Sequence, residues 1–207
     1  TSTSTVFGDK GSDVITYGAS GNNILKGAVY GDAADTTATD GAGNDSITVT
    51  AGGSLISVAT LSGGAGNDTI AITGGEVIST TLNGNQGADN ITVTASSSMI
   101  SSSVFGGSGN DSISLVSASS GLIYGDNGAD TITGVFTSAE VHGDNVGQSN
   151  ADSFSFTTGA TSSATVYGGG GNDAFTIGQA VGTSTLYGGA GADTFSGTTQ
   201  VTLSRVM

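Results

Sequence analysis

The sequence repeats itself along its length in units of about twenty residues. Each unit contains an apolar residue, any residue, Gly, a short loop that ends in Asp, and then alternating apolar residues. From Asp45 onwards the closing Asp recurs at spacings of 23, 21, 22, 19, 22, 21 and 20 residues. The loops are Gly8–Asp13, Asp40–Asp45, Gly63–Asp68, Gly84–Asp89, Gly106–Asp111, Gly125–Asp130, Gly143–Asp152, Gly168–Asp173 and Gly188–Asp193. A repeat of this period predicts stacked structural units rather than one globular core.

Two apolar series accompany the loops and predict strands. After each loop, apolar and polar residues alternate, as in Ile47/Val49, Ile70/Ile72, Ile91/Val93, Ile113/Leu115, Phe154/Phe156 and Phe175/Ile177. Two residues before the loops stand Val6, Leu61, Leu82, Val104, Ile123, Val141, Val166 and Leu186. Each unit therefore reads as two short strands and two turns, which cannot be stable alone. Stacked units predict an all-β fold: a right-handed parallel β-solenoid, or β-roll, of two flattened sheets that forms a single domain over residues 1–207. The absence of Pro agrees with uninterrupted ladders.

The composition excludes several classes of protein. Three Lys and Arg against 17 Asp and Glu give a net charge of −14, so a nucleic-acid partner is not expected. Without Cys and with a single His, His142, the chain can form neither a disulfide framework nor a multi-histidine metal site. No apolar run is long enough for a transmembrane helix, so membrane insertion is not expected. No nucleophile, base and acid form a recognisable motif, so we do not expect an enzyme.

The nine closing Asp residues should form one row on an edge of the solenoid. With coils about 4.8 Å apart, two neighbouring charges repel by roughly 0.9 kcal/mol in water and about 3.5 kcal/mol at an effective dielectric of 20. Carboxylates, Asn amides and carbonyls exposed by Gly turns form an all-oxygen ligand set, which suits Ca²⁺ better than Mg²⁺ or transition metals. The alternative is that these are ordinary turn residues. Their common register favours calcium.

These loops resemble those of the RTX (repeats-in-toxin) β-rolls, whose nonapeptide G-G-x-G-x-D-x-U-x binds Ca²⁺. The segments Gly63–Ile70, Gly106–Ile113, Gly168–Phe175 and Gly188–Phe195 match this pattern in full. The resemblance implies that each ion lies between the loops of adjacent coils, bound by the closing Asp of both loops and by loop carbonyls. It assigns as ligands Asp13, Asp45, Asp68, Asp89, Asp111, Asp130, Asp152, Asp173 and Asp193, and the loop glycines Gly64, Gly66, Gly107, Gly109, Gly128, Gly169, Gly171, Gly189 and Gly191. Nine loops define eight gaps, so about seven or eight Ca²⁺ ions are expected.

The chain also departs from the usual roll. Its coils are longer, and the second edge carries mostly small, neutral turns, so calcium is expected mainly on one edge. At the second loop position, Asp9, Asn85, Asp126 and Asp144 are candidates for additional side-chain ligands. The loop before Asp45 is expected to start at Gly31 and to carry a nine-residue insertion. Its Asp32, Asp35 and Asp40 either form an extra ion site or belong to a solvated loop.

Aromatic residues recur at the position just before a Gly. This position holds Phe7, Tyr17, Tyr30, Phe105, Tyr124, His142, Tyr167 and Tyr187, and alternation predicts that they point outward. One interpretation is a cross-strand ladder that covers its own sheet. The other is a lateral contact surface in an assembly.

Two functions are compatible with this pattern. The first is a secreted structural protein of a bacterial cell surface, such as an S-layer, sheath or filament, with calcium and self-association or neighbouring domains as partners. The second, implied by the resemblance, is the calcium-binding module of a larger secreted enzyme, toxin or adhesin that type I secretion exports.

Overall fold

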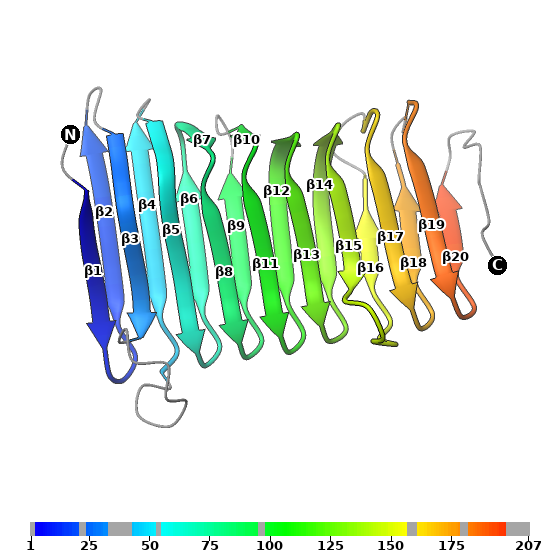
Figure 1. The fold of residues 1–207 in the computed structure, drawn as a ribbon, viewed down its shortest axis with the longest axis horizontal. Helices are drawn as coiled ribbons and strands as arrows, with labels where there is room; N and C mark the ends of the chain where they lie inside the picture. The colour runs from blue at the N-terminus through cyan, green and yellow to red at the C-terminus, as the bar shows by residue number, and fades with distance from the viewer. Residues whose placement is uncertain are drawn as a thin grey trace.

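In a computed structural model, residues 3–20, 24–32, 43–52, 55–94, 98–156, 161–178 and 182–197 are described, and they form an all-β structure. The strands lie side by side along one axis, from β1 at one end to β20 at the other (Figure 1). The described residues contain no helix, and therefore none that could cross a membrane. The strands are β1 (Ser4–Asp9), β2 (Val14–Ser20), β3 (Ile24–Asp32), β4 (Ser46–Gly52), β5 (Leu55–Ala65), β6 (Thr69–Thr73), β7 (Glu76–Ile78), β8 (Thr81–Gln86), β9 (Asn90–Thr94), β10 (Met99–Ile100), β11 (Ser103–Ser108), β12 (Ser112–Ser119), β13 (Leu122–Asn127), β14 (Thr131–Thr137), β15 (Glu140–Asp144), β16 (Ser153–Ser155), β17 (Thr165–Gly170), β18 (Ala174–Ile177), β19 (Thr185–Ala190) and β20 (Thr194–Gly197).

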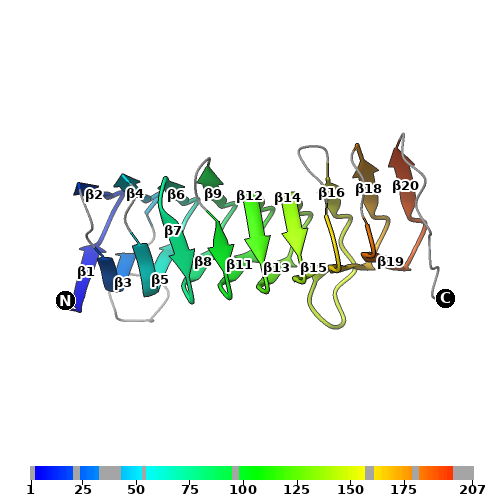
Figure 2. The same ribbon diagram turned by 90° about the horizontal axis from the view of Figure 1, so that it is seen from above.

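All strands except β7 and β10 form two parallel layers, and these two short strands form a parallel ladder between the ends of β5 and β12. One layer runs β1, β3, β5, β8, β11, β13, β15, β17, β19, and every neighbouring pair is parallel. The other runs β2, β4, β6, β9, β12, β14, β16, β18, β20, again all parallel. The view from above separates these two layers (Figure 2). Each coil thus contributes one strand to each layer, which confirms the predicted parallel β-solenoid.

The core lies between the layers and is built from the two predicted apolar series. Leu82 of β8 is in register with Leu61 of β5 and Val104 of β11, and all three are buried. In the opposite layer, Ile91 and Val93 of β9 are also buried, and they belong to the inward-facing rows of that layer. In the C-terminal half the rows become aromatic, and the rings of Phe154 and Phe175 stack with centroids 4.7 Å apart. The alternation of the sequence therefore gives one apolar layer from each sheet, as predicted.

Most of the aromatic residues that precede a Gly form a stacked row on the outer face of the first layer. The rings of Phe105, Tyr124, His142, Tyr167 and Tyr187 stack in succession, with centroids 4.5 to 5.7 Å apart. We call these five residues the aromatic row. Phe7 and Tyr30 form a separate stacked pair, 5.2 Å apart. The cross-strand ladder expected from the sequence is thus present, whereas a lateral contact remains a prediction.

Tyr17 does not belong to this surface, so the prediction that it points outward is wrong. It lies on β2 in the second layer, in register with the buried Val49, and packs against the core. The reason is its phase: Ile15 and Tyr17 share one face of β2, and Ile15 is in register with the buried Ile47. The Gly that follows Tyr17 belongs to the second edge of the solenoid rather than to an Asp loop.

The second edge turns through serines in the left-handed conformation. Five of them have φ between 48° and 53°: Ser79, Ser101, Ser120, Ser138 and Ser163. This conformation is unfavourable for a residue with a side chain, but it aligns the turns of successive coils. The N–H of Ser120, for example, donates a 2.9 Å hydrogen bond to the carbonyl of Thr137 in the next coil.

Candidate metal centre

The closing Asp residues line one edge of the core, where the first-layer strands turn into the second layer. Asp45, Asp68, Asp89, Asp111, Asp130, Asp152 and Asp173 are buried, exposing at most 3 % of their surface. Their burial follows from the strand period, because Asp68 stands two residues before Ile70 and so faces the same way. Asp13 and Asp193, in the two outermost described coils, are partly exposed. We call these nine residues the acidic row.

One oxygen of each carboxylate is used to join neighbouring coils. The N–H of Asp89 donates a 2.7 Å hydrogen bond to Oδ1 of Asp111, and the N–H of Asp111 donates a 2.8 Å bond to Oδ1 of Asp130. The same bond links every consecutive pair of the acidic row from Asp13 to Asp193. These bonds fix the orientation of each carboxylate, so the second oxygens also point in a common direction.

The second oxygens have no donor. Oδ2 is buried without a hydrogen-bond partner in Asp13, Asp45, Asp68, Asp89, Asp111, Asp130, Asp152 and Asp173. A buried carboxylate oxygen that makes no hydrogen bond carries a high desolvation cost. Eight consecutive ones in a native structure require a common explanation.

Backbone carbonyl oxygens lie close to the Oδ2 atoms of the acidic row. A Cβ added to Gly84 would collide with both Oδ2 of Asp89 and the carbonyl oxygen of Gly106, in the following coil. The equivalent pair of oxygens surrounds Gly31, Gly106, Gly125, Gly143 and Gly168. Each such position therefore brings a carboxylate oxygen without a hydrogen-bond partner close to a backbone carbonyl oxygen. Such a pair of oxygen ligands fits a hard cation such as Ca²⁺.

Burial disfavours the charged form of the carboxyl groups in the acidic row. It raises the pKa of Asp68, Asp111 and Asp173 to about 6, although the N–H bond from the preceding coil partly offsets this. For Asp89 and Asp152 burial, followed by the charges of neighbouring carboxylates, raises the pKa to about 7, and for Asp130 to about 8. Near neutral pH the metal-free row therefore resists full ionisation, and a bound cation would remove this resistance.

Side chains alone cannot complete these sites. In the part of the chain that the structure describes, no three His, Cys, Asp or Glu residues are arranged to hold a metal ion together. An ion beside the acidic row must therefore take backbone carbonyls as well, as the loop glycines predict. All nine of those glycines have a left-handed φ, between 102° and 136°: Gly64, Gly66, Gly107, Gly109, Gly128, Gly169, Gly171, Gly189 and Gly191. At Gly109 an added Cβ would also collide with the carbonyl of Gly87, so the coils approach too closely for any other residue.

Two second-position acids accept hydrogen bonds from the backbone of the next coil. Oδ2 of Asp32 accepts a 2.6 Å hydrogen bond from the N–H of Ala65, and Oδ1 of Asp32 is buried without a partner. Asp144 is buried and accepts hydrogen bonds from the N–H groups of Asn150 and Gly170. The charge of Asp32 also raises the pKa of Asp68, and that of Asp144 raises the pKa of Asp152.

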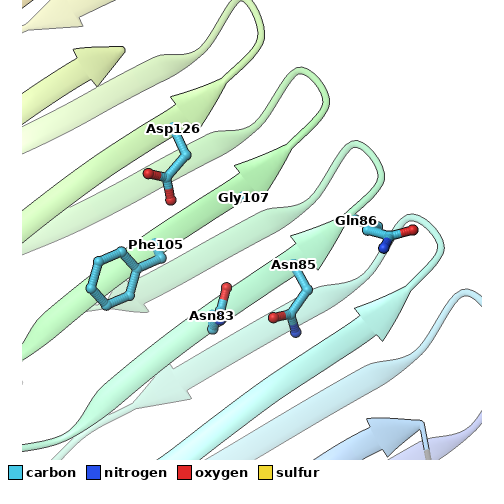
Figure 3. Close-up of a pocket in the computed structure, with 6 residues that line it drawn as sticks. All are labelled: Asn83, Asn85, Gln86, Phe105, Gly107 and Asp126. Atoms are coloured by element: carbon cyan, nitrogen blue, oxygen red, sulfur yellow. The ribbon is translucent and has the colours of Figure 1, made fainter. Parts of the chain in front are cut away.

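The other second-position residues lie elsewhere. Asn85 and Asp126 have left-handed φ values of 80° and 76° and point to the outer face of the first layer (Figure 3). Asp9 adopts the same conformation, with φ of 81°, and is exposed. Asp35 and Asp40 lie outside the described residues.

The sequence analysis missed a second side-chain ladder in the loops. The Asn at the fifth loop position accepts a hydrogen bond from the N–H of the next coil, as Asn67 does from Ala88 at 2.8 Å. Asn44, Asn110 and Asn172 make the same bond. It runs in the opposite direction to the ladder of the acidic row. The recurrence of Asn just before the closing Asp was the available signal.

Comparison with known proteins supports the assignment of five of the nine loops. A family model described as RTX calcium-binding nonapeptide repeat (4 copies) matches residues 60–71, 102–115, 122–134, 165–178 and 182–200. Each matched segment contains one of the Gly-rich Asp loops. Searches of curated proteins and of solved structures gave no significant match.

Proposed function

The chain carries RTX calcium-binding repeats, and from this premise we propose that it is an extracellular structural element, a β-solenoid rod that Ca²⁺ makes rigid. The observation that carries the proposal is the series of eight buried, unpaired Oδ2 atoms, which extends through nearly every described coil. A series of this length makes cation binding a property of the whole rod rather than of one local site.

We assign the ions to the acidic row. The Oδ2 atoms of Asp13 to Asp173, together with carbonyls of the loop glycines, would bind one ion in each gap between coils. Nine loops give eight gaps, and seven divalent ions carry a charge of +14, which cancels the formal net charge of −14. Bound Ca²⁺ would supply positive charge between successive carboxylates, and Asp32, with its unpaired Oδ1, is a candidate ligand for one further ion.

The regularity of the rod supports a structural role. The paired layers continue from the first to the last described strand, and no other fold interrupts them. Repeat proteins of this kind gain stability from each neighbouring interface, so a long regular stack resists bending along its axis. Secretion to the surface of a bacterial cell agrees with the calcium requirement, since RTX repeats are typical of secreted proteins.

The proposal is tested on the native gene product. Immunogold electron microscopy of intact cells should place the protein in a regular surface layer or filament in calcium and should show the layer dispersing in chelator. Finding the repeats joined to a catalytic domain, and released singly into the medium, would instead establish the module of a larger secreted enzyme, toxin or adhesin.

A further inference from the structure

The aromatic row ends at Phe105 because its neighbour in the preceding coil is not aromatic. Phe105 is in register with Tyr124 on one side and with Asn83 on the other. The ring of Tyr124 stacks on Phe105 with centroids 5.7 Å apart, whereas the Asn83 side offers only an amide. Between Tyr30 and Phe105 the same position holds Ser62 and Asn83. One face of the Phe105 ring is therefore not covered by another ring.

This open ring face borders a hollow on the outer surface of the first layer. The hollow has a volume of about 490 Å³ and is lined by Asn83, Asn85, Gln86, Phe105, Gly107 and Asp126. The residues come from three adjacent strands, β8, β11 and β13; the side chains of Asn83, Asn85, Phe105 and Asp126 lie on the same side of the sheet, and Gln86 lies at the end of β8 (Figure 3). The hollow is largely open to solvent, so a ligand would lie on the surface of the sheet rather than inside a closed cavity.

The floor of the hollow depends on one glycine. Asn85, Gly107 and Asp126 are in register on three successive coils, so a position without a side chain lies between an amide and a carboxylate. Gly107 has φ of 112°, and an added Cβ would collide with the carbonyl of Asn85. The gap is thus fixed by the backbone and does not depend on the position of a mobile side chain.

The polar groups around the gap can both donate and accept. The side chains of Asn83 and Gln86 make no hydrogen bond to another described residue, so their amides are available to a ligand. Asn85 uses one N–H to bond Oγ of Ser62, at 2.7 Å, and retains its carbonyl oxygen. Asp126 offers a carboxylate that is held by a hydrogen bond with the side chain of Asn145.

We propose that this hollow, which we call the Phe105 pocket, binds a neutral sugar residue of a glycan. A pyranose ring has an apolar C–H face that can pack on the open face of Phe105, and aromatic faces favour such contacts. Its ring hydroxyls are donors and acceptors at once, which matches the mixture of three amides and one carboxylate. The carboxylate of Asp126 at the edge of the hollow disfavours phosphate and other anionic ligands. This binding activity lies beyond the calcium-dependent structural role and does not rest on it.

The test is a titration of the calcium-loaded protein with single sugars, followed by NMR. Methyl glycosides of glucose, galactose, mannose and N-acetylglucosamine are added to tens of millimolar, and amide resonances are recorded. At least one sugar should shift the resonances of Gly107 and of the Asn83 and Gln86 side chains, with a dissociation constant on the order of millimolar, as expected for an open site. No change with any of the four sugars, or changes confined to other parts of the rod, would overturn the proposal.

Two variants and one matched control identify the groups involved. Phe105→Leu keeps an apolar side chain but removes the ring face, and it should weaken binding by about three- to ten-fold. Asp126→Asn removes the charged acceptor and should weaken binding by about ten-fold. Tyr167→Leu removes a ring from the middle of the aromatic row, away from the pocket, and should leave binding unchanged. Equal weakening by all three, or by none, would overturn the assignment, as would pocket resonances that respond to excess Ca²⁺ but to no sugar.

Discussion

The backbone N–H of Asp111 donates a 2.8 Å hydrogen bond to Oδ1 of Asp130, while Oδ2 of the same Asp130 side chain is buried without a partner. One carboxylate thus has two separable roles. Its first oxygen joins two coils with or without calcium, whereas burial of its second oxygen is favourable only if a cation lies beside it. The following predictions use this division.

Replacing Asp130 by Asn should have opposite effects with and without calcium. Asn retains an oxygen for the N–H of Asp111 and removes the negative charge. In chelator near neutral pH, Asp130→Asn should therefore retain more β structure by circular dichroism than the wild type, because it removes the cost of burying a charge and the repulsion from neighbouring carboxylates. In a calcium titration it should need about ten-fold more Ca²⁺ to fold, because the site loses a charged ligand.

Two further variants control this experiment. Asp130→Ala removes both oxygens and should be less stable than Asp130→Asn in either condition. Asp193→Asn lies at the partly exposed end of the row and should change both measurements less. If Asp130→Asn were destabilised in chelator as much as Asp130→Ala, the second oxygen would not be the source of the repulsion.

The stability of the calcium-free chain should fall as the pH rises. Burial raises the pKa of Asp68, Asp89, Asp111, Asp130, Asp152 and Asp173 from the ordinary 3.8 to between about 6 and about 8 in the folded state. Between these values the folded chain binds more protons than the unfolded chain, so stability is present at low pH and is lost as the pH rises through about 6 to 8. Far-UV circular dichroism in chelator should show more β structure at pH 5 than at pH 8.

With calcium the direction should reverse. Protons compete with Ca²⁺ for the same Oδ2 atoms, so the thermal midpoint in calcium should rise from pH 5 to pH 8. A midpoint that rose with pH in chelator as well would contradict the burial of uncompensated carboxylates.

Backbone conformation should make two glycine substitutions behave oppositely. Gly109→Ala introduces a Cβ at φ of 125° against the carbonyl of Gly87, and it should lower the free energy of unfolding by about 2 kcal/mol or more. Ser120→Gly, at φ of 53° on the other edge, removes a left-handed non-glycine residue and should be neutral or stabilising by up to about 1 kcal/mol. Urea unfolding in saturating calcium measures both. Equal destabilisation by the two variants would show that the loop glycine is not required for its conformation.

The aromatic row should stabilise its own sheet without controlling assembly. Tyr124, Tyr167 and Tyr187 stack with His142 and with one another inside one molecule. Changing all three to Ser should lower stability modestly, since each cross-strand pair contributes roughly 0.2–1 kcal/mol. Light scattering of the calcium-loaded variant should match that of the wild type. A variant that folds normally but no longer associates would establish the row as a lateral contact.

Much of the fold follows from the sequence because burial repeats with the strand period. The rows that contain Leu61 and Ile70 could be assigned from alternation alone, and the loop Asp residues from their spacing. The inward direction of Asp68 was also readable, since it shares the phase of Ile70. By contrast, Tyr17 was misplaced because the Gly that follows it imitates an Asp loop.

Other features depend on contacts between coils that a single repeat does not encode. The bond from Asp111 to Asp130 requires the side-chain orientation of one coil relative to the next. The left-handed φ of Ser120 could not be predicted, because Ser is not typical of that conformation. The Phe105 pocket arises only when the register of β8 and β11 places Asn83 beside Phe105 and Asn85 beside Gly107.

The central claim is that Ca²⁺ is part of the folded structure, and a calcium titration of the metal-free chain tests it most directly. The protein is unfolded in chelator, transferred to calcium-free buffer near neutral pH, and titrated with Ca²⁺ while circular dichroism is recorded and bound metal is measured. We expect a weakly structured chain that becomes rich in β structure in millimolar Ca²⁺, with seven or eight ions bound, and little response to millimolar Mg²⁺. Full β structure before calcium is added, or only one or two bound ions at saturation, would contradict the account.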